Sequence, residues 1–352
     1  METWQKILYN SITTLDELQE QLGCDSTALE EVIANFPMRI NPYFLNLIQS
    51  PGDPLWKQAV PQPAEIRDRV CAEDPLAEDD LSPVPNLVHK YPDRALFLVT
   101  NQCAMYCRFC TRKRKVGTEK MFISDQTLEE GYQYLRKTPQ VREVLLSGGD
   151  PFLLSDSKID SILQTLRAIP SIEVIRIGTR VPSVLPMRVT EDLVAILKKY
   201  HPLYINTHFN HPREITPESS KACNLLADAG IPIGCQTVLL KGINDNSETL
   251  KKLFLGLLKI RVKPYYLFQT DLTKGTNHFR TKTSVGIDIM RNLYGHISGM
   301  AIPTFALDAP GGKGKIPITP QYILEAKGKK KMLVFENYQG DICTYPESGD
   351  GH

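Results

Sequence analysis

Short apolar segments alternate with amphipathic segments along the chain from residue 94 onward. Each amphipathic segment carries Leu, Ile or Ala at spacings of three and four, as a helix with one buried face does. The apolar segments cover residues 95–100, 143–147, 173–178, 203–207, 231–239 and 262–269, and the helical ones cover 125–137, 158–168, 191–200, 217–229 and 247–259. Near-continuous apolar runs are typical of buried parallel strands. Six βα units in succession predict a partial parallel (β/α)6 barrel in the α/β class, although a doubly wound sheet would show the same alternation.

The first 90 residues lack this alternation and predict an N-terminal helical extension that ends in an arm. Thr14 and Glu17 have the spacing of a helix start ahead of the apolar Leu18. The stretch 51–85 is rich in Pro and Asp, which favours an extended path over the surface. We therefore divide the chain into an extension and arm (1–90), a barrel core (91–300) and a C-terminal segment (301–352).

Composition excludes several function classes. The chain has 41 basic and 40 acidic residues and a net charge of +1, which gives no reason to expect nucleic acid or an anionic membrane as a partner. A short basic run at 112–115 lies directly beside a cysteine motif, so we do not interpret it as a nucleic-acid site. No apolar stretch approaches the roughly 20 residues that span a bilayer, and the N-terminus lacks the pattern of a signal peptide. We expect a cytoplasmic protein with no membrane partner.

Cys103, Cys107 and Cys110 form a C-x3-C-x2-C motif after the first predicted strand. Thiolates are ligands of iron–sulfur clusters and of zinc. Three thiolates hold three irons of a cubane and leave the fourth iron open to another ligand. Structural zinc instead requires four closed ligands, and the remaining cysteines offer no obvious second pair. The motif favours a [4Fe–4S] cluster, with zinc as the alternative.

Other unusual residues fall at the predicted carboxyl ends of strands, where α/β proteins place their chemistry. The segment Ser147-Gly148-Gly149-Asp150 ends the second strand, Gly178-Thr179-Arg180 ends the third, His208 and His211 follow the fourth, and Asp271 follows the sixth. This shared position is more informative than any one of these residues.

A glycine-rich stretch, Asp308-Ala-Pro-Gly-Gly-Lys313-Gly-Lys315, lies near the C-terminus. Flexible backbone before a lysine can present its amine to a carbonyl, which suits a lysine that forms a Schiff base with pyridoxal phosphate. A surface loop with two solvated lysines would have the same composition. The stretch does not satisfy the P-loop pattern.

Together these motifs resemble the lysine 2,3-aminomutase family of the radical S-adenosylmethionine superfamily. The resemblance extends from about residue 4 to about residue 345. Its longest matches are at residues 82–85, 91–94, 107–112, 176–180, 206–212, 263–266 and 308–311. It implies a barrel of the radical S-adenosylmethionine type, a cluster on Cys103, Cys107 and Cys110, S-adenosylmethionine and pyridoxal 5′-phosphate as cofactors, and interconversion of L-α-lysine and L-β-lysine, an isomerase activity.

The resemblance also implies roles for individual residues. Lys315 carries the pyridoxal phosphate, although Lys313 stands where the family usually has glycine; Tyr91 and Arg94 bind the phosphate, and Lys90 replaces a nearby arginine of the family. Arg112 pairs with the substrate carboxylate, and Asp271 and Asp308 hold the distal ammonium. Ser147, Gly148, Gly149 and Asp150 match the motif that contacts the methionyl amino group, and His208 and Gln236 are further candidate contacts of S-adenosylmethionine.

Several alternatives remain at this stage. Arginine 2,3-aminomutase is one, because two aspartates would hold a guanidinium equally well, and a radical S-adenosylmethionine enzyme of another reaction is a second. The family implies an external electron donor such as flavodoxin or ferredoxin and a possible homo-oligomer. We expect the C-terminal zinc site of longer members to be absent, because only Cys343 lies nearby and Asn246 replaces a bridging cysteine. The branch that supplies β-lysine to elongation factor P is similar in length, but the sequence does not indicate the fate of the product.

Overall fold

A computed structural model describes residues 2–23, 28–327 and 332–346. Within these ranges nine strands form one sheet in the order β1 to β9. The parallel strands are β2 (Arg94–Thr100), β3 (Glu143–Gly148), β4 (Val174–Gly178), β5 (Leu203–Thr207), β6 (Ile233–Leu239), β7 (Lys263–Gln269) and β8 (Thr304–Ala309). Two antiparallel strands, β1 (Leu87–Tyr91) and β9 (Gly314–Pro317), form its edges. The edges approach each other where the Lys315 amide donates to the Tyr91 hydroxyl at 3.0 Å, so the sheet is a nearly closed barrel.

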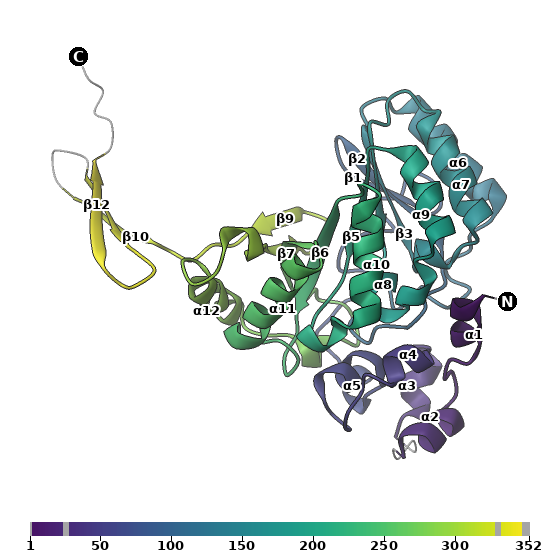
Figure 1. The fold of residues 1–352 in the computed structure, drawn as a ribbon, viewed down its shortest axis with the longest axis horizontal. Helices are drawn as coiled ribbons and strands as arrows, with labels where there is room; N and C mark the ends of the chain where they lie inside the picture. Colours follow the sequence, from purple (N-terminus) through teal and green to yellow (C-terminus); the bar gives the residue numbers. More distant parts are fainter. Residues whose placement is uncertain (1, 24–27, 328–331, 347–352) are drawn as a thin grey trace.

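Helices cover the outer face of this sheet (Figure 1). They are α6 (Asp125–Lys137), α7 (Asp156–Arg167), α8 (Val181–Val184), α9 (Glu191–Leu197), α10 (Pro217–Asp228), α11 (Ser247–Lys259) and α12 (Thr283–Leu293). Several begin at a side-chain cap: Ser124 accepts from the Thr127 amide at 3.2 Å, and Asn246 accepts from the Thr249 amide at 2.9 Å. Buried Leu, Ile, Val and Phe side chains between helices and sheet form the main core.

The predicted partial barrel is confirmed, since each of the six apolar runs forms a strand and each of the five amphipathic segments a helix. The sheet contains one parallel strand more than the prediction, β8, which the sequence analysis left in the C-terminal segment. That segment also contains a separate antiparallel sheet of β10 (Ile323–Lys327), β11 (Met332–Glu336) and β12 (Ile342–Pro346). This sheet projects from the body of the molecule (Figure 1).

The N-terminal extension is helical, as predicted. Its helices are α1 (Thr3–Tyr9), α2 (Leu15–Leu22), α3 (Glu30–Asn35), α4 (Pro42–Leu45) and α5 (Pro54–Ala59). Thr14 caps α2 by accepting from the Glu17 amide at 3.3 Å. The extension has its own core, which includes Ala104 and Met105 of the cysteine motif. The extension therefore packs against the cysteine loop, in a core that Val184 and Leu185 of the barrel share.

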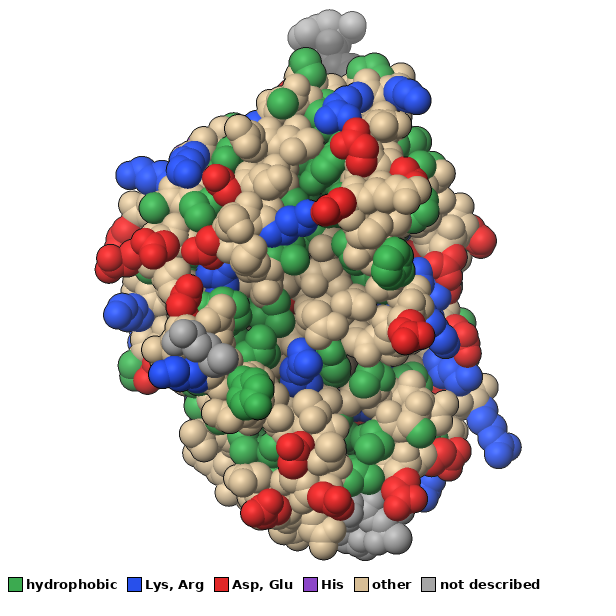
Figure 2. Space-filling view, turned by 90° about the vertical axis from the view of Figure 1, so that its right-hand side faces the viewer, with side chains coloured by type: hydrophobic (Ala, Val, Ile, Leu, Met, Phe, Trp, Pro, Cys, Tyr) green, Lys and Arg blue, Asp and Glu red, His purple; other side chains and the backbone are tan. Residues whose placement is uncertain are grey.

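No helix within the described ranges is long and apolar enough to cross a membrane. On the face shown in Figure 2, basic and acidic side chains are interspersed among apolar ones.

Candidate active site

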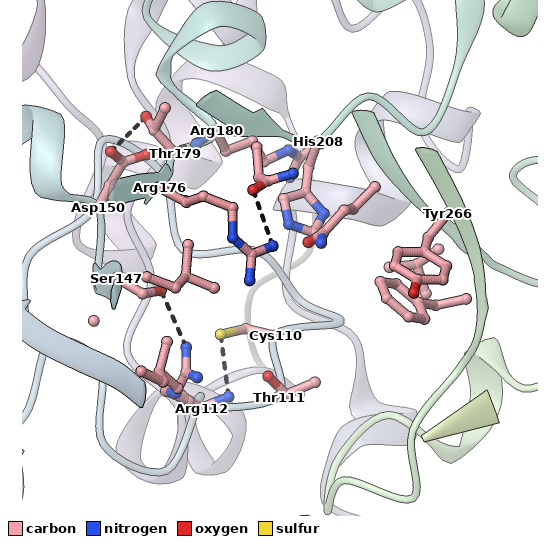
Figure 3. A pocket seen from close by; sticks show the side chains of 18 of the residues that line it. Cys110, Thr111, Arg112, Ser147, Asp150, Arg176, Thr179, Arg180, His208 and Tyr266 are labelled. Atoms are coloured by element: carbon pink, nitrogen blue, oxygen red, sulfur yellow. Dashed lines mark hydrogen bonds between the residues drawn. The ribbon is translucent and has the colours of Figure 1, made fainter. Parts of the chain in front are cut away.

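A cavity of about 970 Å³ occupies the barrel. It is lined by every residue to which the sequence analysis assigned a site role: Lys90, Tyr91, Arg94, Cys103, Cys107, Cys110, Arg112, Ser147, Gly148, Gly149, Asp150, His208, Gln236, Asp271, Asp308 and Lys315. They come from eight of the nine strands or the loops that follow them. Parallel strands bring their carboxyl ends to one rim, so residues far apart in the sequence meet there. Figure 3 shows part of this wall.

The three cysteines of the motif lie in the loop between β2 and α6, and all three line the cavity. Arg180 donates through Nη1 to the Cys107 sulfur at 2.7 Å, and the Cys110 sulfur accepts from the Arg112 amide at 3.3 Å. Burial, followed by the charge of Cys107, raises the pKa of Cys110 to about 11. A positive group would therefore be needed to keep the Cys110 sulfur ionised, and the iron of a bound cluster would supply that charge.

The glycine motif after β3 packs against the backbone of this loop. The Gly149 amide donates to the Thr100 carbonyl at 2.6 Å, and the Asp150 amide donates to the Gln102 carbonyl at 2.7 Å. A Cβ atom on Gly149 would lie 2.2 Å from the Gln102 oxygen, and Gly148 has a φ of +129°. Only glycine fits both positions. The motif thus fixes the start of the cysteine loop as well as lining the cavity.

The Asp150 carboxylate contacts the loop that follows β4. It accepts from the Thr179 hydroxyl at 2.6 Å and from the Arg180 amide at 2.7 Å. Burial raises its pKa, although these donors oppose the shift. Asp150 therefore fixes the backbone of Arg180, whose side chain contacts Cys107. Sequence reasoning did not assign this role to Asp150.

His208 lies beside Arg180 at the cavity wall (Figure 3). Burial, followed by the charge of Arg180, lowers the pKa of His208 to about 4. The imidazole is therefore neutral near pH 7, and it can donate from one nitrogen and accept at the other. Gln236, on the neighbouring strand β6, lines the same part of the cavity.

Asp308 and Lys315 face each other across the antiparallel pair β8 and β9. The Lys315 Nζ lies 3.1 Å from one Asp308 oxygen, and the Lys90 Nζ lies 3.2 Å from the other. Burial, followed by the charge of Asp308, raises the pKa of Asp271 to about 7. Lys313 lies in the exposed turn before β9 and does not line the cavity. Of the two lysines, only Lys315 therefore directs its amine to this group of charges.

Aromatic rings cover one side of the Lys315 amine. Its Nζ lies 5.3 Å from the Phe268 ring centre, and Phe268 stacks on Tyr266 at 4.8 Å. Tyr91 lies under the Arg94 guanidinium at 3.9 Å. Arg94 also pairs with the exposed Asp93 at 2.7 Å. The Lys315 amine thus lies between an aromatic surface and the Asp308 carboxylate.

The basic run at 112–115 is paired with acidic residues of the N-terminal arm. Arg112 contacts Glu78, Arg114 contacts Asp74 and Asp79, Lys115 contacts Asp79, and Lys113 contacts the fully buried Glu65. Lys113, Arg114 and Lys115 therefore make structural contacts, whereas Arg112 also lines the cavity. Sequence reasoning missed Glu78, because it lies in an irregular arm 34 residues before its partner and belongs to no motif.

The three cysteine sulfurs fit a cluster better than a single ion. Among the described residues, no three His, Cys, Asp or Glu side chains converge on a point that could hold one metal ion. In a cubane each thiolate binds a different iron, so the sulfurs need only surround the cluster. All three come from one loop and line the cavity, which leaves the cavity side for a fourth ligand.

Comparison with known proteins gives the chain its family. Residues 97–254 match the model of the radical SAM superfamily, and residues 290–351 match the model named lysine-2,3-aminomutase. An L-lysine 2,3-aminomutase of Acetoanaerobium sticklandii is 49% identical over 350 residues, which are 98% of this chain and 84% of that protein. The chain belongs to the lysine 2,3-aminomutase family. The family, as part of the radical SAM superfamily, implies a [4Fe–4S] cluster and S-adenosylmethionine.

Other lysine 2,3-aminomutase relatives match equally long parts of the chain. The L-lysine 2,3-aminomutase of Clostridium subterminale is 48% identical and covers 98% of this chain and 84% of its own length. The similarity also includes a glutamate 2,3-aminomutase of Clostridioides difficile, which is 44% identical with coverages of 96% and 81%. Membership of the family alone therefore leaves open which amino acid fits the cavity.

Proposed function

We propose that this chain is a lysine 2,3-aminomutase, an isomerase that moves the amino group of L-lysine from C2 to C3 and one hydrogen atom from C3 to C2. The observation that carries the proposal is the pair of carboxylates, Asp271 and Asp308, that line the cavity beside Lys315. A distal ammonium in a closed site requires opposite charge, because an unpaired charge there is costly. Two carboxylates would repel the second carboxylate of glutamate.

The residues around Lys315 fit pyridoxal phosphate. Lys315 would attach the cofactor, Phe268 would cover one face of its ring, and Tyr91, Arg94 and Lys90 would hold its phosphate, since guanidinium and ammonium groups bind phosphate well. When bound, pyridoxal phosphate supplies a conjugated system that stabilises a radical beside the migrating nitrogen, and the cluster with S-adenosylmethionine supplies the radical that removes hydrogen.

The chain's own residues bind and orient the substrate in this proposal. Arg112 would bind the α-carboxylate, and Asp271 with Asp308 would bind the distal ammonium. The distance between Arg112 and the two aspartates would then select for the length of the substrate. Lys90 already contacts Asp308 and would move toward the phosphate when the substrate ammonium takes its place. The neutral His208 and Gln236 would contact S-adenosylmethionine without adding charge. The barrel wall would limit the access of water and other reactive groups to the radical.

The partners and the location belong to the same proposal. An external one-electron donor such as flavodoxin or ferredoxin would reduce the cluster, and the cytoplasm would keep the three thiols reduced until the cluster is inserted. The chain would act without nucleic acid or membrane, and it could form a homo-oligomer.

An anaerobic assay tests the proposed function. The reconstituted and reduced protein is supplied with S-adenosylmethionine and pyridoxal phosphate, and L-lysine, L-arginine, L-glutamate and L-ornithine are offered separately. We expect only lysine to give its β-isomer, detected by mass spectrometry after derivatisation. Formation of β-arginine instead would support the arginine alternative. Cleavage of S-adenosylmethionine with all four amino acids unchanged would overturn the aminomutase proposal.

A further inference from the structure

Glu78 binds one complete edge of the Arg112 guanidinium. The Nε atom lies 2.8 Å and the Nη2 atom 2.6 Å from the Glu78 oxygens, and both side chains are largely buried. The other terminal nitrogen, Nη1, lies 3.4 Å from the Ser147 hydroxyl at the end of β3 (Figure 3). Arginine has two edges that can each receive a carboxylate. One edge is thus occupied by the protein, and the Nη1 side lines the cavity.

The turn that carries Glu78 is itself held rigidly. The Glu78 amide donates to an Asp74 oxygen at 3.1 Å, and the Glu78 carbonyl accepts from the Ser82 hydroxyl at 2.6 Å. The same turn contacts the hairpin that carries Lys315, where the Gly311 amide donates to the Pro75 carbonyl at 2.8 Å. Glu78 therefore occupies a fixed place relative to both the cysteine loop and the lysine hairpin.

Besides Glu78, the long side chain of Arg112 has other carboxylates in the same cavity with which it could pair. Asp271 is affected by the charges of both Asp308 and Glu78, so a second source of negative charge lies near the Glu78–Arg112 pair, and Lys315 and Lys90 offset only part of it. Without Glu78, the guanidinium would gain most by pairing with that charge. Such a pair would remove both the group that binds the substrate carboxylate and the group that binds its ammonium.

We propose that Glu78 is a positioning residue, which holds Arg112 so that its Nη1 side binds the substrate α-carboxylate and so that the guanidinium stays away from Asp271 and Asp308. The inference rests on the proposed function, because it assumes an amino acid with a carboxylate at one end and a cation at the other. The two ends of the site would then be kept apart by one buried carboxylate of the N-terminal arm.

The test compares Glu78→Gln with the wild-type holoenzyme. Binding of L-lysine and of L-lysinamide, whose carboxylate is replaced by a neutral amide, is measured by anaerobic calorimetry, and kcat and KM for lysine are measured in parallel. We expect Glu78→Gln to weaken lysine binding about tenfold to a hundredfold, the range for a hydrogen bond to a charged group, and to change kcat by no more than about threefold. The preference for lysine over lysinamide should nearly disappear.

Two further variants serve as controls. Asp79→Asn removes a carboxylate of the same turn that contacts Arg114 and Lys115 but not Arg112, and it should keep the wild-type preference. Glu78→Asp keeps the charge and should restore part of the preference for lysine over lysinamide. It also replaces Glu78→Gln in the test if Glu78→Gln does not fold. A general structural defect would weaken lysine and lysinamide equally.

The outcomes separate this inference from the proposed function. A Glu78→Gln enzyme that keeps the wild-type preference for lysine over lysinamide overturns the role of Glu78 while lysine turnover by the wild type still stands. The wild-type enzyme could instead bind lysine through its carboxylate, in a way that depends on Glu78, without isomerising it. That result overturns the proposed function and supports the positioning role of Glu78. A wild-type enzyme that does not distinguish lysine from lysinamide overturns the inference.

Discussion

The guanidinium of Arg180 lies 2.7 Å from the sulfur of Cys107, a candidate cluster ligand. Its other terminal nitrogen is held by Gln58 at 2.6 Å and by the buried Glu214 at 3.1 Å. Hydrogen bonds and net charge near the sulfurs set the potential of an iron–sulfur cluster. The chain thus places the Arg180 cation against a candidate cluster ligand, and the Glu214 carboxylate binds the same guanidinium.

Substituting these two residues should shift the cluster potential in opposite directions. Arg180→Gln removes positive charge and should lower the midpoint potential by on the order of tens of millivolts, whereas Glu214→Gln leaves Arg180 uncompensated and should raise it. Potentiometric titration followed by electron paramagnetic resonance measures both. Equal potentials in all three proteins would show that the contact has no effect on the cluster.

Lys315 and Lys313 should behave very differently when replaced by alanine. Lys315 lies in the cavity and contacts Asp308, whereas Lys313 lies in the exposed turn. Lys315→Ala should lose the absorption band of bound pyridoxal phosphate and lower turnover by about a thousandfold or more, since the group that holds the cofactor is gone. Lys313→Ala should keep both. Loss of the band in Lys313→Ala alone would reverse the assignment.

Binding of lysine should depend on pH through Asp271. Its pKa in the folded protein is about 7, above the ordinary value of 3.8, because of burial and then the charge of Asp308. The folded protein therefore holds this proton more tightly than the unfolded chain does, so ionising Asp271 removes stability as the pH rises toward 7. The substrate ammonium prefers the ionised form. Lysine affinity should rise between about pH 6 and pH 8, and Asp271→Asn should flatten this rise in a calorimetric series.

Glu65→Gln should destabilise the fold strongly. Glu65 is buried and pairs with Arg108 at 2.5 Å and with Lys113 at 2.7 Å. Removing its charge leaves two buried cations without a counter-ion, at a cost of about 3–5 kcal/mol. Chemical denaturation measures the loss. The control is Glu173→Gln, which breaks an exposed pair with Arg142 and should leave the unfolding curve unchanged.

Gly149→Ala should prevent loading of the cluster. An added Cβ would lie 2.2 Å from the Gln102 carbonyl oxygen, so the start of the cysteine loop must move. Iron and sulfide content after anaerobic reconstitution should fall well below wild type. Gly299→Ala is the matched control, because nothing lies within 4 Å of its added Cβ. A fully loaded Gly149→Ala protein would show that the loop tolerates the shift.

The sequence predicted those parts of the molecule that have local or repeated signals. The six apolar runs indicated their strands, because a buried strand excludes polar residues along several positions. It did not reveal β8, whose short segment Thr304–Ala309 contains Asp308 and stands beside a glycine-rich turn. The residues that motifs and family resemblance singled out for a site role all line the cavity. Glu78 and the contact between Arg180 and Cys107 were not predictable, since each depends on contacts between distant segments.

The barrel wall is not equally strong along its circumference. Neighbouring strands from β1 to β9 are joined by ladders of backbone hydrogen bonds, but β1 meets β9 through the Tyr91 hydroxyl and meets the adjacent β8 through the pair Lys90–Asp308. Each such contact contributes only about 1 kcal/mol, whereas separating any other two strands breaks a whole ladder. The seam between β1 and β9 is therefore where the wall opens at the lowest cost in free energy. Lys315 lies on this seam.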